Sequence, residues 1–232
     1  MSSIQAIKIG NDSARTYVRI DTNGNPMAIG IAIDEEAING NGNEMSMNML
    51  PLPTDANSKL PFKAISMDWN PLGHEPLIFF ANQHFDFHFY LAPESEIHNI
   101  GMDSSKMYKE PIQSDVPAGY TGYVNITPGP GRIATGGVPQ MGWHMTDSTV
   151  AMIPGQYVFD HIFIYGFYNG KMNFMEPMIT KDFLKAKTAV TVNIKQPQTY
   201  LNSGNYWPTK YTIRYDATAK QYLVEMHDMM LR

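Results

Sequence analysis

Residues 84–90 read His-Phe-Asp-Phe-His-Phe-Tyr, and the strict alternation of polar and aromatic side chains limits what this segment can form. Successive side chains of a β-strand point to opposite faces, so His84, Asp86 and His88 share one face and the three Phe share the other. A polar row on a partly buried strand costs free energy unless its groups find partners. The segment therefore predicts a strand with an aromatic, core-facing side and a second side that carries a functional site.

The rest of the chain is typical of short strands joined by turns. Sixteen Pro and eighteen Gly, with abundant Tyr and Phe, favour strands over long helices. Strands are predicted at 15–20, 26–33, 77–91, 157–168, 171–176, 210–215 and 221–226, and short helices at 94–100 and 180–187. Asn-Gly pairs at 23–24 and 169–170 indicate hairpins, and the strands on either side of residues 216–219 suggest a third. We predict an α+β, mainly β fold: antiparallel sheets or a barrel-like core built from hairpins, with a few short helices.

A single domain is expected across residues 1–232, because a chain of this length can bury one substantial core. Residues 39–61 show no sustained period and are predicted to be a loop excursion. Residues 101–142 are turn-rich and are predicted to form a loop that delivers Trp143 and His144. Within them, residues 127–131 lack the Gly-Lys-Ser/Thr ending of a phosphate-binding loop, so no nucleotide cofactor is expected.

Composition argues against several classes of partner. Seventeen Lys and Arg against twenty-two Asp and Glu give a net charge of −5, and without a basic run nucleic acid is not an expected partner. No apolar stretch reaches the roughly 18 residues of a membrane span, and residues 1–5 lack the features of a signal peptide. Because cysteine is absent, any metal must be held by His, carboxylate or Met.

Three blocks of sequence, taken in order, resemble a known family. They are residues 73–76 (Gly-His-Glu-Pro) leading to 84–90, residues 141–144 (Met-Gly-Trp-His), and residues 161–166 (His-Ile-Phe-Ile-Tyr-Gly) leading to 174–180 (Phe-Met-Glu-Pro-Met-Ile-Thr). They are similar to a bacterial family of unknown function, mostly exported proteins, whose structural representative is a thermophile protein under sigma and anti-sigma factor control. The resemblance implies a β-rich α+β fold, export to the periplasm or cell surface, and a homo-oligomer. It implies no activity.

The same blocks contain side chains that suit a metal ion. Histidine and carboxylate bind zinc, and also iron, manganese or nickel, when thiolates are absent. The predicted ligands of a divalent metal site are His84, Asp86, His88, His144 and Glu176, and the predicted supporting residues are His74 and His161. At about 3.3 Å per residue, His84 and His88 lie roughly 13 Å apart along a strand. One ion would therefore take Asp86 with one flanking His, together with His144 and Glu176.

Two smaller features carry weaker interpretations. Trp143 and Tyr90 are candidates for the wall of a small-molecule pocket, although aromatic residues at strand spacing more often belong to the core. Met45, Met47 and Met49 alternate within the predicted loop. Soft thioethers select Cu(I), but a Met-rich segment without a metal is the more common case.

Two functions of different classes remain open. In the first, the chain is a metal-binding protein or a metalloenzyme that activates water. In the second, it is a non-enzymatic exported binding or stress-response protein that acts as an oligomer, and Asp86 with its flanking imidazoles forms a hydrogen-bonded network that fixes strand register. A third interpretation of the cluster is a metal-free His/Asp acid-base pair. Against it, no Gly-x-Ser-x-Gly motif occurs, so hydrolysis through an acyl-enzyme is disfavoured.

Overall fold

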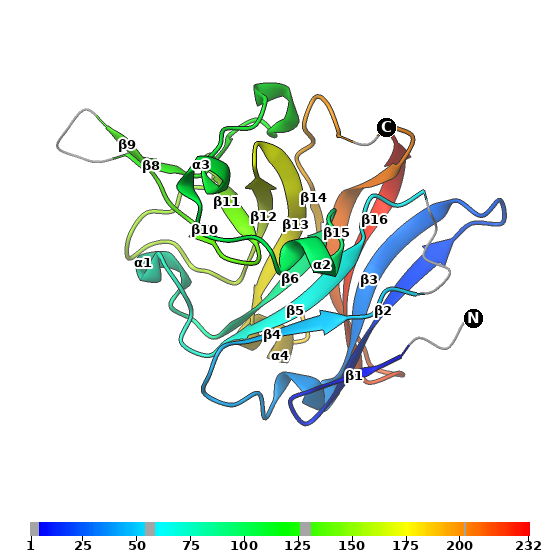
Figure 1. The fold of residues 1–232 in the computed structure, drawn as a ribbon. Coiled ribbons are helices and arrows are strands. Elements are labelled where there is room, and N and C mark those ends of the chain that lie inside the picture. Colours follow the sequence, from blue (N-terminus) through cyan, green and yellow to red (C-terminus); the bar gives the residue numbers. More distant parts are fainter. Residues whose placement is uncertain (1–4, 54–58, 126–130, 202) are drawn as a thin grey trace.

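Two antiparallel β-sheets pack face to face in the computed structural model, which describes residues 5–53, 59–125, 131–201 and 203–232. Figure 1 shows the blue and red strands of one sheet lying against the cyan and yellow strands of the other. The alternating segment 84–90 forms an inner strand of the second sheet, so both of its edges are paired.

The first sheet brings the two ends of the chain together. In spatial order its six strands are β1 (Ile7–Ile9), β2 (Asp12–Ile20), β3 (Pro26–Asp34), β16 (Gln221–Leu231), β15 (Tyr206–Asp216) and β14 (Val190–Asn193). Ile31 of β3 stands opposite Val224 of β16, which joins the first hairpin to the last. Both of these hairpins confirm the sequence prediction.

The second sheet has eight strands. In spatial order they are β10 (Gly137–Val138), β11 (Gly142–Asp147), β12 (His161–Tyr168), β13 (Lys171–Thr180), β6 (His84–Tyr90), β5 (Ala64–Asn70) and β4 (Ser46–Leu50), with β7 (Tyr120–Thr121) paired to β11. Between β12 and β13, Asn169 and Gly170 have φ of 50° and 75°, as a two-residue hairpin turn requires. The predicted middle hairpin is thus also confirmed.

The remaining elements are short. A two-stranded ribbon is formed by β8 (Tyr123–Asn125) and β9 (Arg132–Ala134), and the helices are α1 (Leu77–Phe80), α2 (Glu94–Ile97), α3 (Ser104–Met107), α4 (Lys181–Lys185) and the 3-10 turns η1 (Glu35–Ile38) and η2 (Gln113–Asp115). The mainly β, α+β fold class is confirmed, and the sheets of the described residues do not close into a barrel. None of the helices in this part of the chain has the length and apolar character needed to cross a bilayer.

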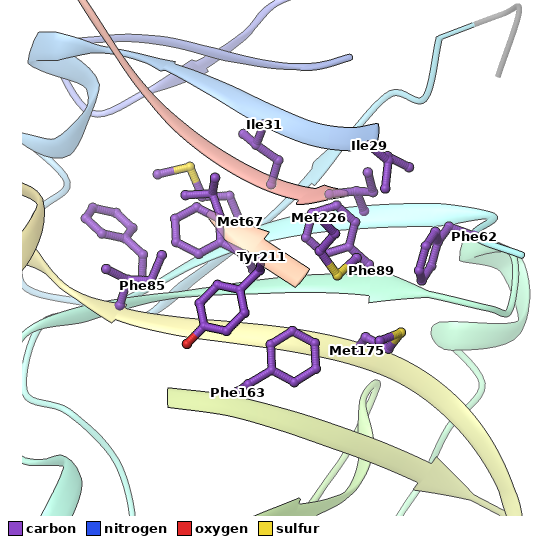
Figure 2. Close-up of a cluster of buried hydrophobic side chains, with 14 of the residues drawn as sticks. Ile29, Ile31, Phe62, Met67, Phe85, Phe89, Phe163, Met175, Tyr211 and Met226 are labelled. Atoms are coloured by element: carbon purple, nitrogen blue, oxygen red, sulfur yellow. The ribbon is translucent and has the colours of Figure 1, made fainter. Parts of the chain in front are cut away.

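Apolar side chains fill the space between the two sheets. Figure 2 shows Ile29 and Ile31 of β3 and Met226 of β16 facing Phe85 and Phe89 of β6. The Phe side chains of β6 have no solvent exposure, and burying each contributes roughly 1.5–3 kcal/mol relative to leaving it exposed. The aromatic side of the alternating strand therefore lies in the inter-sheet core, and its polar side points to the opposite face of the sheet.

The structure corrects the predicted start of the central strand. Residues 77–80 form helix α1, and the strand begins at His84. Four consecutive apolar residues have no period that separates a strand from a helix, and the sequence prediction merged them with the strand that follows.

Two predicted loops also contain strands. Residues 39–61 include β4, so Met47 and Met49 belong to a strand paired with β5. Residues 101–142 include the short strands β7, β8, β9 and β10, and the two residues that this segment was predicted to deliver, Trp143 and His144, lie on β11. Residues 1–4, 54–58 and 126–130, which carry part of the signal-peptide, loop and phosphate-loop interpretations, lie outside the described residues. The single-domain interpretation stays a prediction.

Candidate metal centre

The polar face of β6 belongs to a larger polar patch on the side of the eight-stranded sheet away from the inter-sheet core. Residues opposite one another on paired strands point to the same face of a sheet. The patch consists of Ser66, Asp68 and Asn70 of β5, His84, Asp86 and His88 of β6, Glu176 of β13 and His144 of β11. Four strands thus contribute to one largely buried surface.

His88, His144 and Glu176 form a first group of candidate ligands. His88 Nε2 lies 3.6 Å from Glu176 Oε1, and His144 Nε2 lies 3.7 Å from Glu176 Oε2. The three side chains each offer one ligand atom, and these atoms lie within 4.8 Å of one another. His88 and Glu176 are buried, whereas the His144 side chain is 14% exposed. The first group therefore meets solvent at His144.

Contacts at Nδ1 orient both imidazoles of the first group. His88 Nδ1 lies 3.0 Å from Asp68 Oδ2, and His144 Nδ1 lies 2.8 Å from the carbonyl oxygen of Gly136. Because a carbonyl oxygen only accepts, His144 Nδ1 carries a proton, and the neutral ring presents its Nε2 lone pair to Glu176. Metal-binding His residues are held in this way, with an oxygen acceptor fixing one ring nitrogen and the other left for the ion.

His74, His84 and Asp86 form a second group. His84 Nε2 lies 3.3 Å from Asp86 Oδ1, and His74 Nε2 lies 3.6 Å from Asp86 Oδ2. The Nδ1 atoms again meet carbonyl oxygens, that of Asn82 at 2.7 Å from His84 and that of Glu75 at 3.0 Å from His74. Both Nε2 atoms therefore face the Asp86 carboxylate with their lone pairs when the rings are neutral.

The loop between β5 and α1 carries His74 onto this face. Gly73 has φ +66°, and a Cβ there would lie 2.0 Å from the carbonyl oxygen of Phe80, so the position requires glycine. The backbone N–H of His74 donates to the same carbonyl at 3.2 Å, and the His74 ring packs edge-on against His84 at 4.7 Å. The loop is thus folded back on α1, and it leaves the His74 side chain 30% exposed.

Aromatic side chains cover the second group on the face of the sheet that points away from the inter-sheet core. Phe159 packs against His84 at 5.2 Å and against Phe80 of α1 at 5.1 Å. Phe79 packs against Tyr157 at 6.0 Å. The segment before β12 and the segment around α1 therefore meet over the polar patch and reduce its contact with water.

Several buried polar atoms within the two groups make no hydrogen bond to the described residues. They are His84 Nε2, Asp86 Oδ1, His88 Nε2 and both carboxylate oxygens of Glu176. Buried polar groups are normally paired, and each unmade bond costs about 1–3 kcal/mol. Within each group these atoms face one another, so a cation between them would satisfy them together.

The nitrogen–oxygen separations match those between two ligands of one ion. Two donor atoms about 2.1 Å from an ion, at a tetrahedral angle, lie about 3.4 Å apart. The four separations within the groups are 3.3, 3.6, 3.6 and 3.7 Å. They exceed the roughly 2.7–3.2 Å of an N–H···O hydrogen bond, so the geometry fits coordination better than direct hydrogen bonding.

Burial and neighbouring charges set the protonation of the first group. Burial lowers the pKa of His88, but Glu176 and Asp68 outweigh it and raise the pKa to about 9. Burial raises the pKa of Glu176 above its usual range. Burial and the charge of His88 lower the pKa of His144 to about 3. At neutral pH His144 is ready to act as a ligand, whereas His88 holds a proton that an ion must displace.

The second group is a mutually stabilised set of charges. Burial raises the pKa of Asp86, but the neighbouring imidazoles of His74 and His84 outweigh it and hold the pKa well below its usual range. For His74, burial lowers the pKa and Asp86 raises it overall, to about 9. Asn70 Nδ2 also donates to Asp86 Oδ2 at 2.7 Å, which orients the carboxylate.

The structure separates residues that the sequence prediction gathers around one ion. His144 and Glu176 lie with His88, whereas His84 and Asp86 lie with His74, which is predicted only as a supporting residue. His161 points to the other side of the sheet, where its Nδ1 lies 2.9 Å from the Tyr211 hydroxyl.

The two aromatic residues predicted to wall a pocket lie on different faces. Tyr90 is on the polar face and stacks on the His88 ring, with centroids 5.3 Å apart and planes at 12°. Trp143 packs in the inter-sheet core, and its Nε1 donates to the carbonyl oxygen of Thr135 at 2.9 Å. Of these two residues, Tyr90 is therefore the one that contacts a candidate ligand.

Sequence reasoning missed all three β5 residues of the patch. Ser66, Asp68 and Asn70 alternate with Ile65, Met67 and Trp69 in a period of two, which is the signal that would have identified them. Across from them on β4, Met47 stands opposite Asp68 and Met49 opposite Ser66, so both thioethers share the patch's face. Both pack against its hydrophobic surroundings, and the copper interpretation stays a prediction.

Comparison with known proteins finds one partial likeness. Residues 21–69 match the model of a family described as TTHB210-like, hypothetical protein TTHB210. The matched segment runs from the first hairpin through most of β5 and includes Asp68, and it supports a likeness to an uncharacterised family. No curated protein and no solved structure matches the chain significantly. Export and assembly into an oligomer stay predictions.

Proposed function

We propose that this protein binds a divalent first-row metal ion through His88, His144 and Glu176. The donor set of two imidazoles and one carboxylate suits zinc, and also iron, manganese or nickel. Asp68 would hold the His88 ring and raise the basicity of its Nε2, as carboxylates beside metal-binding His do. The proposal concerns binding first, because coordination is what the geometry supports most directly.

The observation that carries the proposal is the state of three buried atoms. His88 Nε2 and both oxygens of Glu176 make no hydrogen bond to the described residues. Glu176 Oε1 lies 3.6 Å from His88 Nε2 and Oε2 lies 3.7 Å from His144 Nε2, which are separations expected for ligands of one ion. An uncompensated carboxylate in this position is costly, whereas an ion held by excellent geometry offsets its desolvation. A cation therefore satisfies the buried atoms more completely than the side chains satisfy each other.

A site with three protein ligands keeps a coordination position open for water or substrate. Three protein ligands are the number found in catalytic zinc sites, where a fourth position holds water or substrate. A water bound there would have its pKa lowered by the ion, and Glu176 or Asp86 would serve as its proton acceptor. A hydrolytic or hydration reaction at the partly exposed His144 side is the form that a metalloenzyme function would take.

One observation favours the competing, metal-free function. A pKa of His88 near 9 means that an imidazolium between Asp68 and Glu176 is stable in the metal-free protein. Such an ion-paired network would fix strand register in an exported binding or stress-response protein that acts as an oligomer. The two functions differ in what His88→Ala removes: bound metal with the fold retained, or the fold itself.

The test is elemental analysis of protein purified without an affinity tag or chelator. After incubation with Zn²⁺, Mn²⁺, Fe²⁺ or Ni²⁺, one of these ions is expected at one or more equivalents per chain. The thermal midpoint should also rise, because an ion that binds only the folded state at about 100 times its Kd adds about 2.7 kcal/mol. Less than about 0.1 ion per chain with all four metals would overturn the proposal, since a formed site binds tightly.

Matched variants separate ligation from general effects of substitution. Glu176→Gln and His144→Ala are expected to abolish binding to the first group and its thermal shift. Glu94→Gln and His98→Ala change the same residue types at exposed positions, where the side chains are 55% and 52% exposed, and should bind as the unmodified protein does. Equal loss in all four variants would show that the effect is not ligation.

A further inference from the structure

We infer that His74, His84 and Asp86 hold a second divalent ion, so that one face of the sheet carries two separate mononuclear metal sites. The inference rests on the metal binding proposed for the first group. It assigns direct ligation to His74, which lies outside the strands and is predicted from the sequence only as a supporting residue.

The second group repeats the chemistry of the first. Each group has two imidazoles and one carboxylate, and in each the Nε2 atoms lie 3.3–3.7 Å from the carboxylate oxygens. His84 is fully buried and its Nε2 makes no hydrogen bond to the described residues, as is also true of Asp86 Oδ1. Two unpartnered, buried atoms aimed at each other are the same signal that identifies the first group.

The surroundings of the second group are built to orient its ligands. Asn70 donates to Asp86 Oδ2, and the carbonyl oxygen of Asn82 fixes His84 at Nδ1. The His74 ring is fixed at Nδ1 by the carbonyl oxygen of Glu75. Each ligand therefore has its own supporting hydrogen bond, which a side chain that merely filled space would not need.

Strand geometry makes the two sites separate rather than bridged. Asp86 and His88 are two residues apart on β6, so the two groups are about 7 Å apart along the strand. Ions that share a bridging ligand in two-metal sites lie about 3.5–4 Å apart. Each ion would therefore have its own three protein ligands and its own open position, available to water or to a small anionic oxygen ligand.

The two sites should differ in affinity. His74 comes from a loop and is 30% exposed, whereas all ligands of the first group come from paired strands and its His88 and Glu176 are buried. Two dications about 7 Å apart also repel each other, which penalises whichever ion binds second. We expect the second group to bind at least about tenfold more weakly than the first and to exchange its ion faster.

Titration of chelator-stripped protein with Co²⁺ tests the inference, with bound cobalt counted by elemental analysis and coordination followed by visible absorption. The unmodified protein should bind two equivalents in two resolved steps. His74→Ala should lose the weaker cobalt-binding step and keep the tighter one. Glu176→Gln should lose the tighter step and keep the weaker one. His98→Ala, at an exposed position, should keep both steps.

The outcomes distinguish this inference from the function on which it rests. One equivalent that survives His74→Ala and disappears in Glu176→Gln overturns the second site and leaves the first. One equivalent lost in both variants shows a single shared site and also overturns the inference. No bound cobalt in any protein, with other divalent ions equally absent, overturns both proposals. If His74→Ala fails to fold, the number of cobalt equivalents bound by the unmodified protein still decides between one metal site and two.

Discussion

Asp68 Oδ2 lies 3.0 Å from His88 Nδ1, and on the other side of the same imidazole Nε2 faces Glu176. The ring is thus held between two buried carboxylates on two different strands. Ser66 Oγ donates to Asp68 Oδ2 at 3.1 Å, so the orienting carboxylate is itself oriented. A buried chain from hydroxyl to carboxylate to imidazole is the support expected of a metal ligand rather than of a residue that only packs.

The first prediction concerns Asp68→Asn. The amide keeps the size of the carboxylate but removes its charge, so His88 Nε2 becomes less basic and the ring less firmly held. Metal affinity should fall by about 10–100-fold, the usual cost of losing such a partner. Competition with a chelator of known affinity measures the change. Asp147→Asn, at a carboxylate paired with Lys195 away from the patch, is the matched control and should leave affinity unchanged.

The second prediction concerns the stability of the metal-free protein against pH. The pKa of His88 is about 9 in the folded protein, above the value of about 6.5 for an unperturbed imidazole. A raised folded pKa contributes stability that is complete below pH 6.5 and is lost as pH rises to about 9. The free energy of unfolding should therefore fall across this window, and His88→Gln should flatten the fall. A free energy of unfolding that rises between pH 6.5 and about 9 would contradict this prediction.

The second prediction has a counterpart in metal binding: because of the proton on His88, metal affinity should depend on pH in the opposite direction from the stability of the metal-free protein. An ion must displace the proton on His88, so affinity should rise by about tenfold per pH unit for each proton displaced, levelling off near pH 9. Calorimetry in buffers with different ionisation enthalpies counts the protons released. Release of no proton at pH 7 would show that His88 is not a ligand.

How far the fold follows from the sequence depends on the local pattern of each segment. The alternation at 84–90 and the Asn-Gly turn at 169–170 are local signals, and the structure forms the strand and the hairpin that they predict. Residues 77–80 carry no such signal, and they form a helix instead of the predicted strand. Short apolar runs take their conformation from tertiary packing, here that of Phe80 against Phe159.

The candidate site was predictable in its residue types but not in its grouping. The polar face of β6 follows from alternation, whereas the pairing of Glu176 with His88 rather than Asp86 depends on the register between β13 and β6. Register is set by the partner strand and by the turn that precedes it, neither of which the segment itself encodes. Asp68 was missed because β5 follows a Pro-rich stretch that hides the start of its alternation.

The third prediction tests the aromatic side of the same strand. Phe87 is fully buried behind Asp86 and His88, so Phe87→Ala removes a ring from the inter-sheet core and leaves a cavity. The free energy of unfolding of the metal-free protein should fall by about 3–5 kcal/mol. Leu72→Ala, at a side chain that is 78% exposed, should change it by less than about 0.5 kcal/mol. Denaturant titration measures both, and a loss below about 1 kcal/mol for Phe87→Ala would contradict the burial of this face.

The fourth prediction uses the loop that carries His74. Gly73 has φ +66°, and a Cβ there would meet the carbonyl oxygen of Phe80 at 2.0 Å, so Gly73→Ala must shift the loop and move His74 away from Asp86. The weaker cobalt step should be lost or weakened by tenfold or more, while the tighter step at the first group stays. Gly101→Ala is the matched control, since its Cβ would have no neighbour within 4 Å and its φ is not in the left-handed region. Two unchanged steps in Gly73→Ala would mean that the second ion does not depend on His74, because a displaced loop cannot keep the imidazole within reach of the ion.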